Sequence, residues 1–132
     1  MRRADGLRRA DGLRRTGEPI TDGRLTVAEY LECWLSVTEP TVRLSTYQRY
    51  QQYVRVHAVP IIGHLRLVEL KPMQLQLLYA KRLQAGSSPS TVHHLHACLH
   101  RALAMAERWE QVNRNVARLV TPPRVPRGRA SR

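Results

Sequence analysis

Four segments of this chain place their apolar residues three and four positions apart, and proline or glycine separates each segment from the next. This spacing repeats along one face of an α-helix, whereas a half-buried strand would alternate every second residue. Proline and glycine between the segments mark helix ends, because neither residue continues a helix well. The pattern predicts one all-α domain built as a bundle of four helices.

The first predicted helix begins at a capping box of Thr26 and Glu29, in which each side chain accepts a hydrogen bond from the other residue's backbone N–H. Pro40 sets its end. The inward stripe predicted for this helix is Val27, Tyr30, Leu31, Trp34 and Leu35.

The second predicted helix runs from Thr46 to about His57, with Ser45 as its N-cap and Pro60 closing it. Its predicted inward stripe is Tyr47, Tyr50 and Val54. An apolar connection follows, and we expect its side chains to hold it against the core: Ile61, Ile62, Leu65, Leu67 and Leu70.

The third predicted helix starts near Pro72, a residue favoured at the first helical position, and stops at Gly86. Its inward residues are Leu75, Leu78, Tyr79 and Leu83. The fourth helix is the longest, from about Ser90 to Glu110, after a turn rich in serine that offers an N-cap. Its predicted inward residues are Val92, Leu95, Leu99, Ala102, Leu103, Ala106 and Trp109.

The two ends of the chain differ from the helical part. Residues 1–24 carry the hexapeptide RRADGL twice in tandem and form an expected flexible basic arm. Residues 25–112 form the expected domain, and residues 113–132 an extended basic tail that holds a Pro-Pro pair.

The charge predicts a polyanionic partner. The chain has 22 Lys and Arg against 10 Asp and Glu, a net charge of +12, and only Lys71 and Lys81 among its cations are lysines. A GC-rich genome also enriches arginine, which accounts for part of this excess. Neutralising phosphates releases bound counterions, so a basic surface favours nucleic acid. The excess of basic over acidic residues is also found in the helical part, because residues 25–120 hold eleven basic and six acidic residues.

Other classes of protein receive little support. No apolar run is long enough to span a membrane and no secretory signal is present, so we expect a cytoplasmic protein, and we read Cys33 and Cys98 as reduced. There is no phosphate-binding glycine loop, zinc-protease motif or nucleophilic triad, and hence no expected enzyme or cofactor. His93, His96 and His100 share a helix face near Cys98, but they lack the paired spacing of zinc motifs, so no metal is expected.

Taken in order, the segments resemble the SAM-like core-binding domain of tyrosine recombinases, the phage-integrase family, over roughly residues 25–123. The likeness rests on the tryptophan-bearing helix LTVAEYLECWL, Ser45-Thr46 with Tyr50, Pro60 with Gly63, Leu67-x-x-Leu70, and Ser90-Thr91-Val92. Two departures are Asn115-Val116, where the family often has Asn-Pro, and the short repeat where many relatives carry an arm-binding domain.

The resemblance implies a four-helix bundle flanked by basic tails. It also implies that the second and fourth helices of the bundle face the major groove of duplex DNA. In that family the nucleophilic tyrosine and its phosphate-activating partners belong to a following catalytic domain. All five tyrosines here, at positions 30, 47, 50, 53 and 79, fall in the helical part. The expectation is therefore a DNA-binding module without strand cleavage, partnered by double-stranded DNA and by other recombinase protomers on it.

Ten residues are the candidate DNA contacts. The start of the second helix combines hydroxyls and guanidinium groups suited to phosphate oxygens, and the start of the fourth helix is rich in hydroxyls. The candidates are Arg43, Ser45, Thr46, Arg49, Ser87, Ser88, Ser90 and Thr91, with His94 and Arg101 on the outer face of the fourth helix. The alternative for the hydroxyls is helix capping, and for the arginines a solvated surface.

A second function class stays open at this point. The chain could be a helical protein-interaction module whose basic charge is incidental. An exposed apolar patch that remains after the bundle packs would favour this alternative, whereas basic residues beside hydroxyl-rich helix starts favour phosphate.

Overall fold

The computed structural model describes residues 23–124, which fold into four long helical segments with no strand among them. Both the all-α class and the number of helices are confirmed. The segments are α1 (Val27–Thr38); α2 (Leu44–Gln52), which continues through the π-helical η3 (Tyr53–Ala58) into α3 (Val59–Ile62); α4 (Pro72–Gln84); and α5 (Pro89–Arg108). Short 3-10 turns occur at η2 (Glu39–Thr41), η4 (Leu67–Glu69) and η5 (Val116–Leu119).

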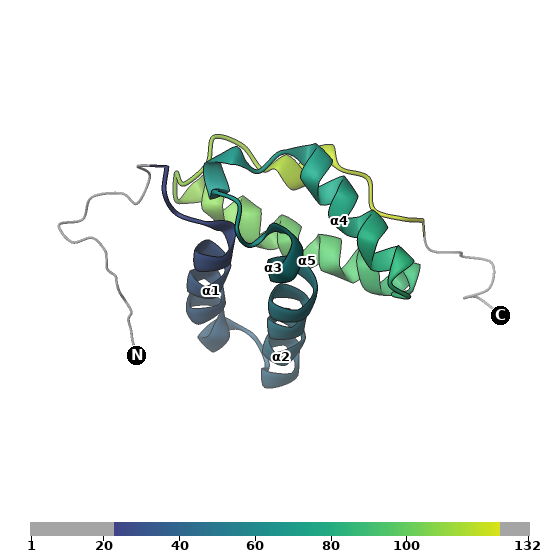
Figure 1. Cartoon of the computed structure of the whole chain (residues 1–132). Helices are drawn as coiled ribbons and strands as arrows, with labels where there is room; N and C mark the ends of the chain where they lie inside the picture. Colours follow the sequence, from purple (N-terminus) through teal and green to yellow (C-terminus); the bar gives the residue numbers. More distant parts are fainter. Residues whose placement is uncertain (1–22, 125–132) are drawn as a thin grey trace.

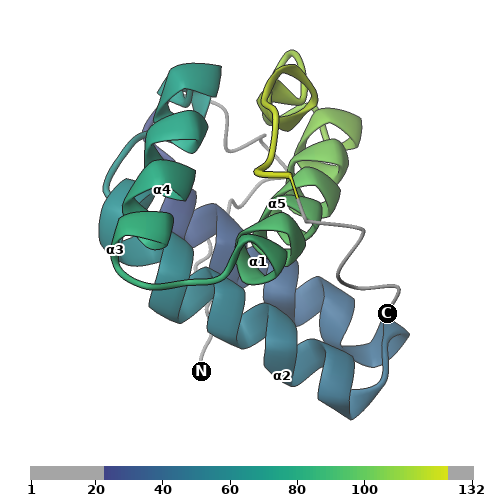
Figure 2. The same ribbon diagram turned by 90° about the vertical axis from the view of Figure 1, so that its right-hand side faces the viewer.

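The helices lie in two layers. α1 and the continuous α2–η3–α3 helix form a hairpin, and this hairpin projects from a layer made by α4 and α5 (Figures 1 and 2). Helix α2 runs across the direction of α5, so the two helices enclose a corner on one side of the molecule (Figure 1). No helix in the described part of the chain is long and apolar enough to cross a membrane.

The predicted capping box opens α1. Thr26 Oγ1 accepts from the Glu29 N–H at 3.1 Å, and Glu29 Oε1 accepts from the Thr26 N–H at 3.0 Å. Backbone hydrogen bonds from Val27 N–H to Leu65 O and from Leu67 N–H to Leu25 O, both 2.8 Å, then fix the start of the helix to the apolar connection. The connection is therefore held by its backbone as well as by its side chains.

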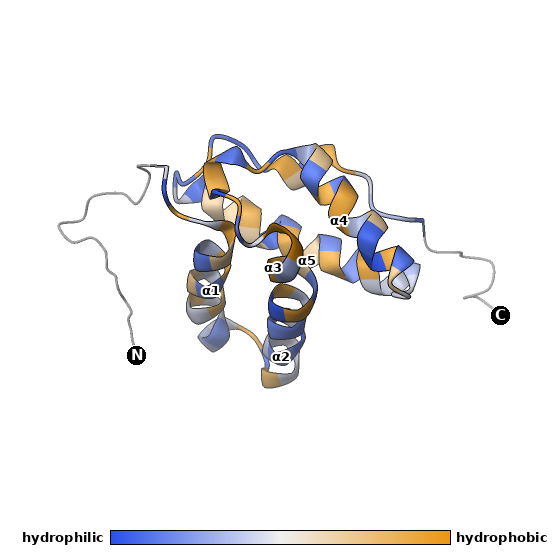
Figure 3. Ribbon diagram, viewed as in Figure 1, coloured by the Kyte–Doolittle hydropathy of each residue, from blue (hydrophilic) through white to orange (hydrophobic). Residues whose placement is uncertain are grey.

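The predicted inward stripes form one core. All five inward residues of α1 are buried, as are those of α5 up to Ala106. Each helix carries both hydrophobic and hydrophilic residues along its length, as amphipathic helices do (Figure 3). In the second helix, Tyr47 and Tyr50 of α2 are only half-buried against the core, and Val54 of η3 is fully buried. The Tyr30 hydroxyl joins the layers by donating to the Ala102 carbonyl at 2.6 Å.

Pro60 does not close the second helix, which contradicts the prediction. The helix continues to Ile62, and the turn before the proline is π-helical, with the Val59 N–H bonded five residues back to Val54 O. In a regular α-helix a proline ring clashes with the carbonyl four residues earlier. The wider π turn, a known form of helix bulge, relieves that clash.

Two residues predicted to be inward are exposed. Leu83 and Trp109 are each 37% exposed. Leu83 lies in the last turn of α4, close to its end at Gln84. Helix α5 ends at Arg108, so Trp109 leaves the helical stripe, and its ring packs edge-on against that of Tyr30 with ring centroids 6.3 Å apart. The prediction for Trp109 was wrong because α5 ends before its stripe does, and that for Leu83 was wrong because the end of α4 is exposed.

The packed part extends beyond residue 112, where the sequence placed its end. Val116, Ala117 and Val120 are buried in the core. Asn115 holds this segment, because its Nδ2 donates to His100 O at 3.1 Å and its Oδ1 accepts from the Ala117 N–H at 2.9 Å. The tandem repeat and the end of the tail, expected to be flexible, lie outside the described residues.

Gly63 is expected to resist substitution although its backbone is not strained. It is the C-cap of α3 with a φ of −62°, and a Cβ there would lie 2.6 Å from Val59 O and 2.8 Å from Val59 Cγ1. Gly63→Ala should therefore lower the free energy of unfolding by about 1–3 kcal/mol through overpacking. Urea denaturation followed by circular dichroism measures this, and a change below about 0.5 kcal/mol would mean that Val59 yields to the added methyl group.

Candidate DNA-binding surface

Helix α2 starts two residues earlier than predicted. Arg43 is the N-cap, with an extended backbone and a carbonyl that accepts from the Tyr47 N–H at 2.9 Å. Ser45 is the second helical residue and not the N-cap, and no side chain caps this helix. The physical reason is that Arg43 already has the extended backbone of an N-cap, so the helix begins at Leu44. The first N–H groups of α2 are thus not taken up by an N-cap side chain.

The start of α5 follows the prediction. Ser88 is the N-cap, and its Oγ accepts from the Thr91 N–H at 3.1 Å. The same hydroxyl lies 3.1 Å from Thr91 Oγ1, to which it donates. Ser87 Oγ lies 3.3 Å from Arg82 Nη2, and Ser90 is exposed. Part of this hydroxyl-rich turn is therefore engaged in capping, as the alternative interpretation proposed.

His94 and Arg101 are both exposed on α5, seven residues apart and hence on one face. Tyr53 connects this face to α2. Burial raises the pKa of Tyr53, the charge of Arg49 lowers it, and Cys98 of α5 raises it. Burial likewise raises the pKa of Cys98 to about 12, against the opposing charge of Arg101. Arg49 lies in the last turn of α2, just before η3, and η3 packs against α5, which carries Arg101.

The ten candidates do not form one cluster. The first turn of α2 lies at the free end of the hairpin, away from α4 and α5 (Figure 1). Arg43 and Ser45 are therefore separated from the serines that open α5. Of the candidates on the second helix, Arg49 lies furthest along α2, next to η3, which packs against α5. A ligand touching all ten residues would have to be extended, as a duplex is.

The carboxylates pair with arginines other than the candidates. Glu32 binds Arg55 through two contacts of 2.8 Å, Glu69 pairs with Arg66, and Glu107 pairs with Arg118. Within residues 23–124, Arg43, Arg49 and Arg101 form no ion pair. Their charge remains available to an anion.

The histidines of α5 are arranged by packing. His96 Nδ1 lies 2.8 Å from the Tyr79 hydroxyl, and burial, His100 and His93 all lower its pKa. No group of three His, Cys, Asp or Glu side chains in the described residues is placed to hold a metal ion.

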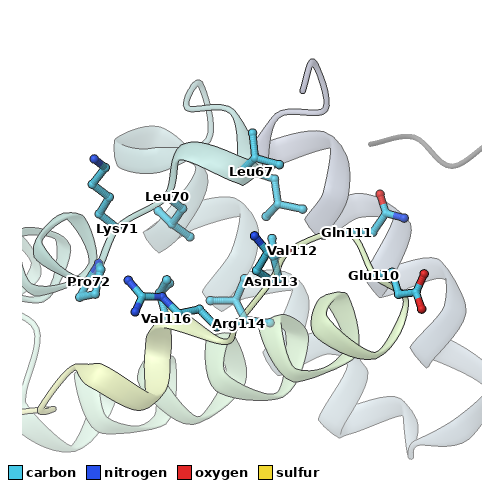
Figure 4. Close-up of a pocket in the computed structure, with 12 residues that line it drawn as sticks. Leu67, Leu70, Lys71, Pro72, Glu110, Gln111, Val112, Asn113, Arg114 and Val116 are labelled. Carbon is cyan, nitrogen blue, oxygen red and sulfur yellow. The ribbon is translucent and has the colours of Figure 1, made fainter. Parts of the chain in front are cut away.

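A cavity of about 460 Å³ lies beyond the C-terminal end of α5, between the 67–72 segment and the 110–116 loop. Its walls combine leucine and valine side chains with both charges, and Lys71 and Glu110 stand at opposite ends of it (Figure 4). A 20-residue helix is about 30 Å long, so this cavity is remote from the start of α5. None of the ten candidates lines it.

Sequence reasoning missed three residues that the fold brings beside the candidates: Tyr53, His57 and Arg82. His57 and Arg82 are 25 positions apart, and only the packing of the second helix against α4 and α5 brings them together. No local pattern in the sequence marks either residue.

The comparisons with known proteins agree with this fold. The sequence pattern of the family described as phage integrase, N-terminal SAM-like domain, matches residues 26–83. The solution structure of a phage integrase SAM-like domain from Moorella thermoacetica is 34% identical, with a TM-score of 0.68, and the match covers 82% of this chain and 93% of that one. An integrase-like domain from Bacillus cereus shares the fold at 23% identity and a TM-score of 0.74, covering 83% and 91%.

A longer relative shows how much of an integrase this chain matches. An integrase from Saccharopolyspora erythraea is 29% identical over 103 residues, which is 76% of this chain but 24% of that protein. The chain thus spans about a quarter of that relative's length. From these matches, the chain belongs to the family of phage integrase N-terminal SAM-like domains.

Proposed function

We propose that this chain is the duplex-DNA-binding module of a recombinase and binds DNA without cleaving it. The observation that carries the proposal is the set of arginines on α2 and α5 that have no carboxylate partner in the described part. Arg43 and Arg49 lie on α2 and Arg101 lies on α5, and the continuation of α2 into η3 packs against α5. Guanidinium groups on two crossing helices can contact phosphates on either side of a groove. A DNA partner would place the protein in the cytoplasm beside the nucleoid.

The tyrosines support binding without cleavage. Tyr30 and Tyr79 are buried, and burial raises the pKa of both. Tyr47, Tyr50 and Tyr53 are half-buried against the core. A nucleophile must approach the scissile phosphate freely, and a core-packed phenol cannot.

The alternative, a protein-interaction module, is favoured by one observation. Met73 and Leu77 are 70% and 52% exposed and lie one turn apart on α4, so they form an apolar strip on the outside of the bundle. The partner protein most consistent with the family is a second recombinase protomer. This strip is on a different helix from the basic candidates, and a contact there is compatible with DNA binding on α2 and α5.

One experiment tests the proposed function. The full chain is titrated into a fluorescently labelled duplex of random sequence, and anisotropy is followed at several salt concentrations. We expect a dissociation constant of roughly 10⁻⁴–10⁻⁶ M at physiological salt and a log K that falls linearly with log salt. Contacts to about three phosphates give a slope near −2.7. Negligible binding at low salt would reject DNA binding and leave the protein-interaction module.

A further inference from the structure

Three buried polar side-chain atoms in the described residues have no hydrogen-bond partner: His57 Nδ1, Arg82 Nε and Gln111 Oε1. Buried polar atoms without a partner are rare in folded proteins, and each needs a physical explanation. Gln111 lines the cavity at the far end of α5. His57 lies in η3 and Arg82 in the last turn of α4, and the second helix packs against α4 through α3, which directly follows η3. Burial and then the charge of Arg82 lower the pKa of His57, as expected for neighbouring groups. The unpartnered atoms of His57 and Arg82 therefore belong to the same region of the fold.

That region adjoins the start of α5. Arg82 lies in the last turn of α4, and its Nη2 donates to Ser87 Oγ at 3.3 Å. Ser87 immediately precedes the N-cap Ser88 of this 20-residue helix. The backbone N–H of Ser87 donates to Arg82 O at 3.0 Å, so the turn holds the two residues together. The positive end of the α5 dipole adds to the charge of the guanidinium there.

No negative charge balances this cation. Arg82 forms no ion pair with any of the carboxylates in residues 23–124. Its side chain is half-buried, and His57 beside it is only 9% exposed. The aromatic ring of Tyr53, 6.2 Å from that of His57, offers no charge. Partial burial of an uncompensated guanidinium is costly, and an anion of matching shape would offset that cost.

We infer that Arg82 and Ser87, with His57 behind them, form a binding site for a phosphate group. On the proposed function, on which this inference rests, the phosphate is one of the duplex backbone. The planar guanidinium can donate two N–H bonds to phosphate oxygens through its terminal nitrogens, while Nε–H stays buried behind them. The Ser87 hydroxyl supplies a third donor. The site therefore attaches the start of α5 to the DNA backbone through side chains of α4 and of the turn between α4 and α5.

The first test compares two neutral variants of neighbouring cations. Arg82→Gln and Lys81→Gln remove the same charge from adjacent positions of α4, and the exposed Lys81 side chain forms no ion pair within residues 23–124. In full-chain anisotropy titrations we expect Arg82→Gln to weaken duplex binding about 10-fold and to reduce the salt slope by about one, since one phosphate contact is lost. Lys81→Gln should change binding about two-fold or less. Equal effects of the two variants would overturn the inference.

Arg82→Lys keeps the positive charge but removes the bidentate guanidinium. This variant replaces Arg82→Gln in the test if Arg82→Gln does not fold. It should bind the duplex more weakly than wild type, because a lysine ammonium cannot replace a bidentate guanidinium. Binding of this variant equal to wild type would mean that only the charge acts, which contradicts the proposed bidentate contact.

The second test separates this inference from the proposed function. The Nε–H resonance of Arg82, assigned in ¹⁵N spectra by its loss in Arg82→Lys, is followed during titration with the duplex and with inorganic phosphate. A shift with both ligands supports a phosphate site that the DNA backbone occupies. If the duplex does not bind but phosphate moves the resonance, the proposed function fails and the site takes free phosphate. If the duplex binds and the resonance does not move, the inference fails and the proposed function stands.

Discussion

Replacing Trp34 by alanine is expected to lower the free energy of unfolding by about 3–5 kcal/mol, which is a large part of the stability of a domain this size. Trp34 is 2% exposed in the middle of α1, and its ring lies 5.3 Å from that of Tyr50 across the hairpin. Truncation removes the largest buried side chain of the core and the surface on which Tyr50 packs. The hairpin of α1 and α2 should loosen first.

A leucine pair gives the matched control for this effect. Leu99 of α5 is buried, whereas Leu77 of α4 is 52% exposed. Leu99→Ala should cost about 2–5 kcal/mol, and Leu77→Ala should cost about 0.5 kcal/mol or less, although both remove the same atoms. Urea denaturation followed by circular dichroism measures all three variants. Similar losses for Leu99→Ala and Leu77→Ala would show that the inward face of α5 has been assigned wrongly.

The double substitution Arg43→Ala with Arg49→Ala should weaken duplex binding by about 50-fold at 0.1 M salt. The estimate follows from counterion release, which contributes roughly a factor of eight per phosphate contact at that concentration. The salt slope should fall by about two, and the free energy of unfolding should stay unchanged because neither arginine forms an ion pair in the described part. Anisotropy titration across a salt series measures both quantities.

The control for this prediction removes the same charge elsewhere. Arg55→Ala with Arg118→Ala eliminates two arginines that already pair with Glu32 and Glu107. Net charge changes equally, so a general electrostatic attraction would respond equally to both double variants. We expect the control to weaken binding about three-fold or less. An equal loss in the two double variants would show that α2 holds no localised DNA contact.

The Arg82 variants and the Arg43→Ala, Arg49→Ala double variant test different parts of one proposed surface. Arg43 and Arg49 lie on the second helix, whereas Arg82 lies beside the start of the fourth. If both sets weaken binding, the duplex lies across the corner between α2 and α5. If only the Arg82 variants weaken duplex binding, the DNA contact is restricted to the turn between α4 and α5.

Local sequence determined where most helices begin and end. The Thr26–Glu29 capping box, Pro72 at the first position of α4 and the hydroxyl cap Ser88 all act within four residues of themselves. Gly86 has a φ of +105°, a conformation that glycine adopts without strain, and it stops α4 as predicted. Periodicity likewise identified nearly the whole core, because a helix repeats every 3.6 residues wherever it is placed.

Only the tertiary structure decided the features that depend on distant partners. The second helix passes through Pro60 because a π turn accommodates the ring, and Val116, Ala117 and Val120 are buried because Asn115 fixes their segment to α5. The meeting of His57 and Arg82, and the pairing of acids with arginines other than the candidates, depend on packing between helices. The sequence thus determined the helices and their inward faces, since those follow from local backbone chemistry. The positions of unpaired charges had to come from the fold, since a charge is balanced by whatever side chain the fold places beside it.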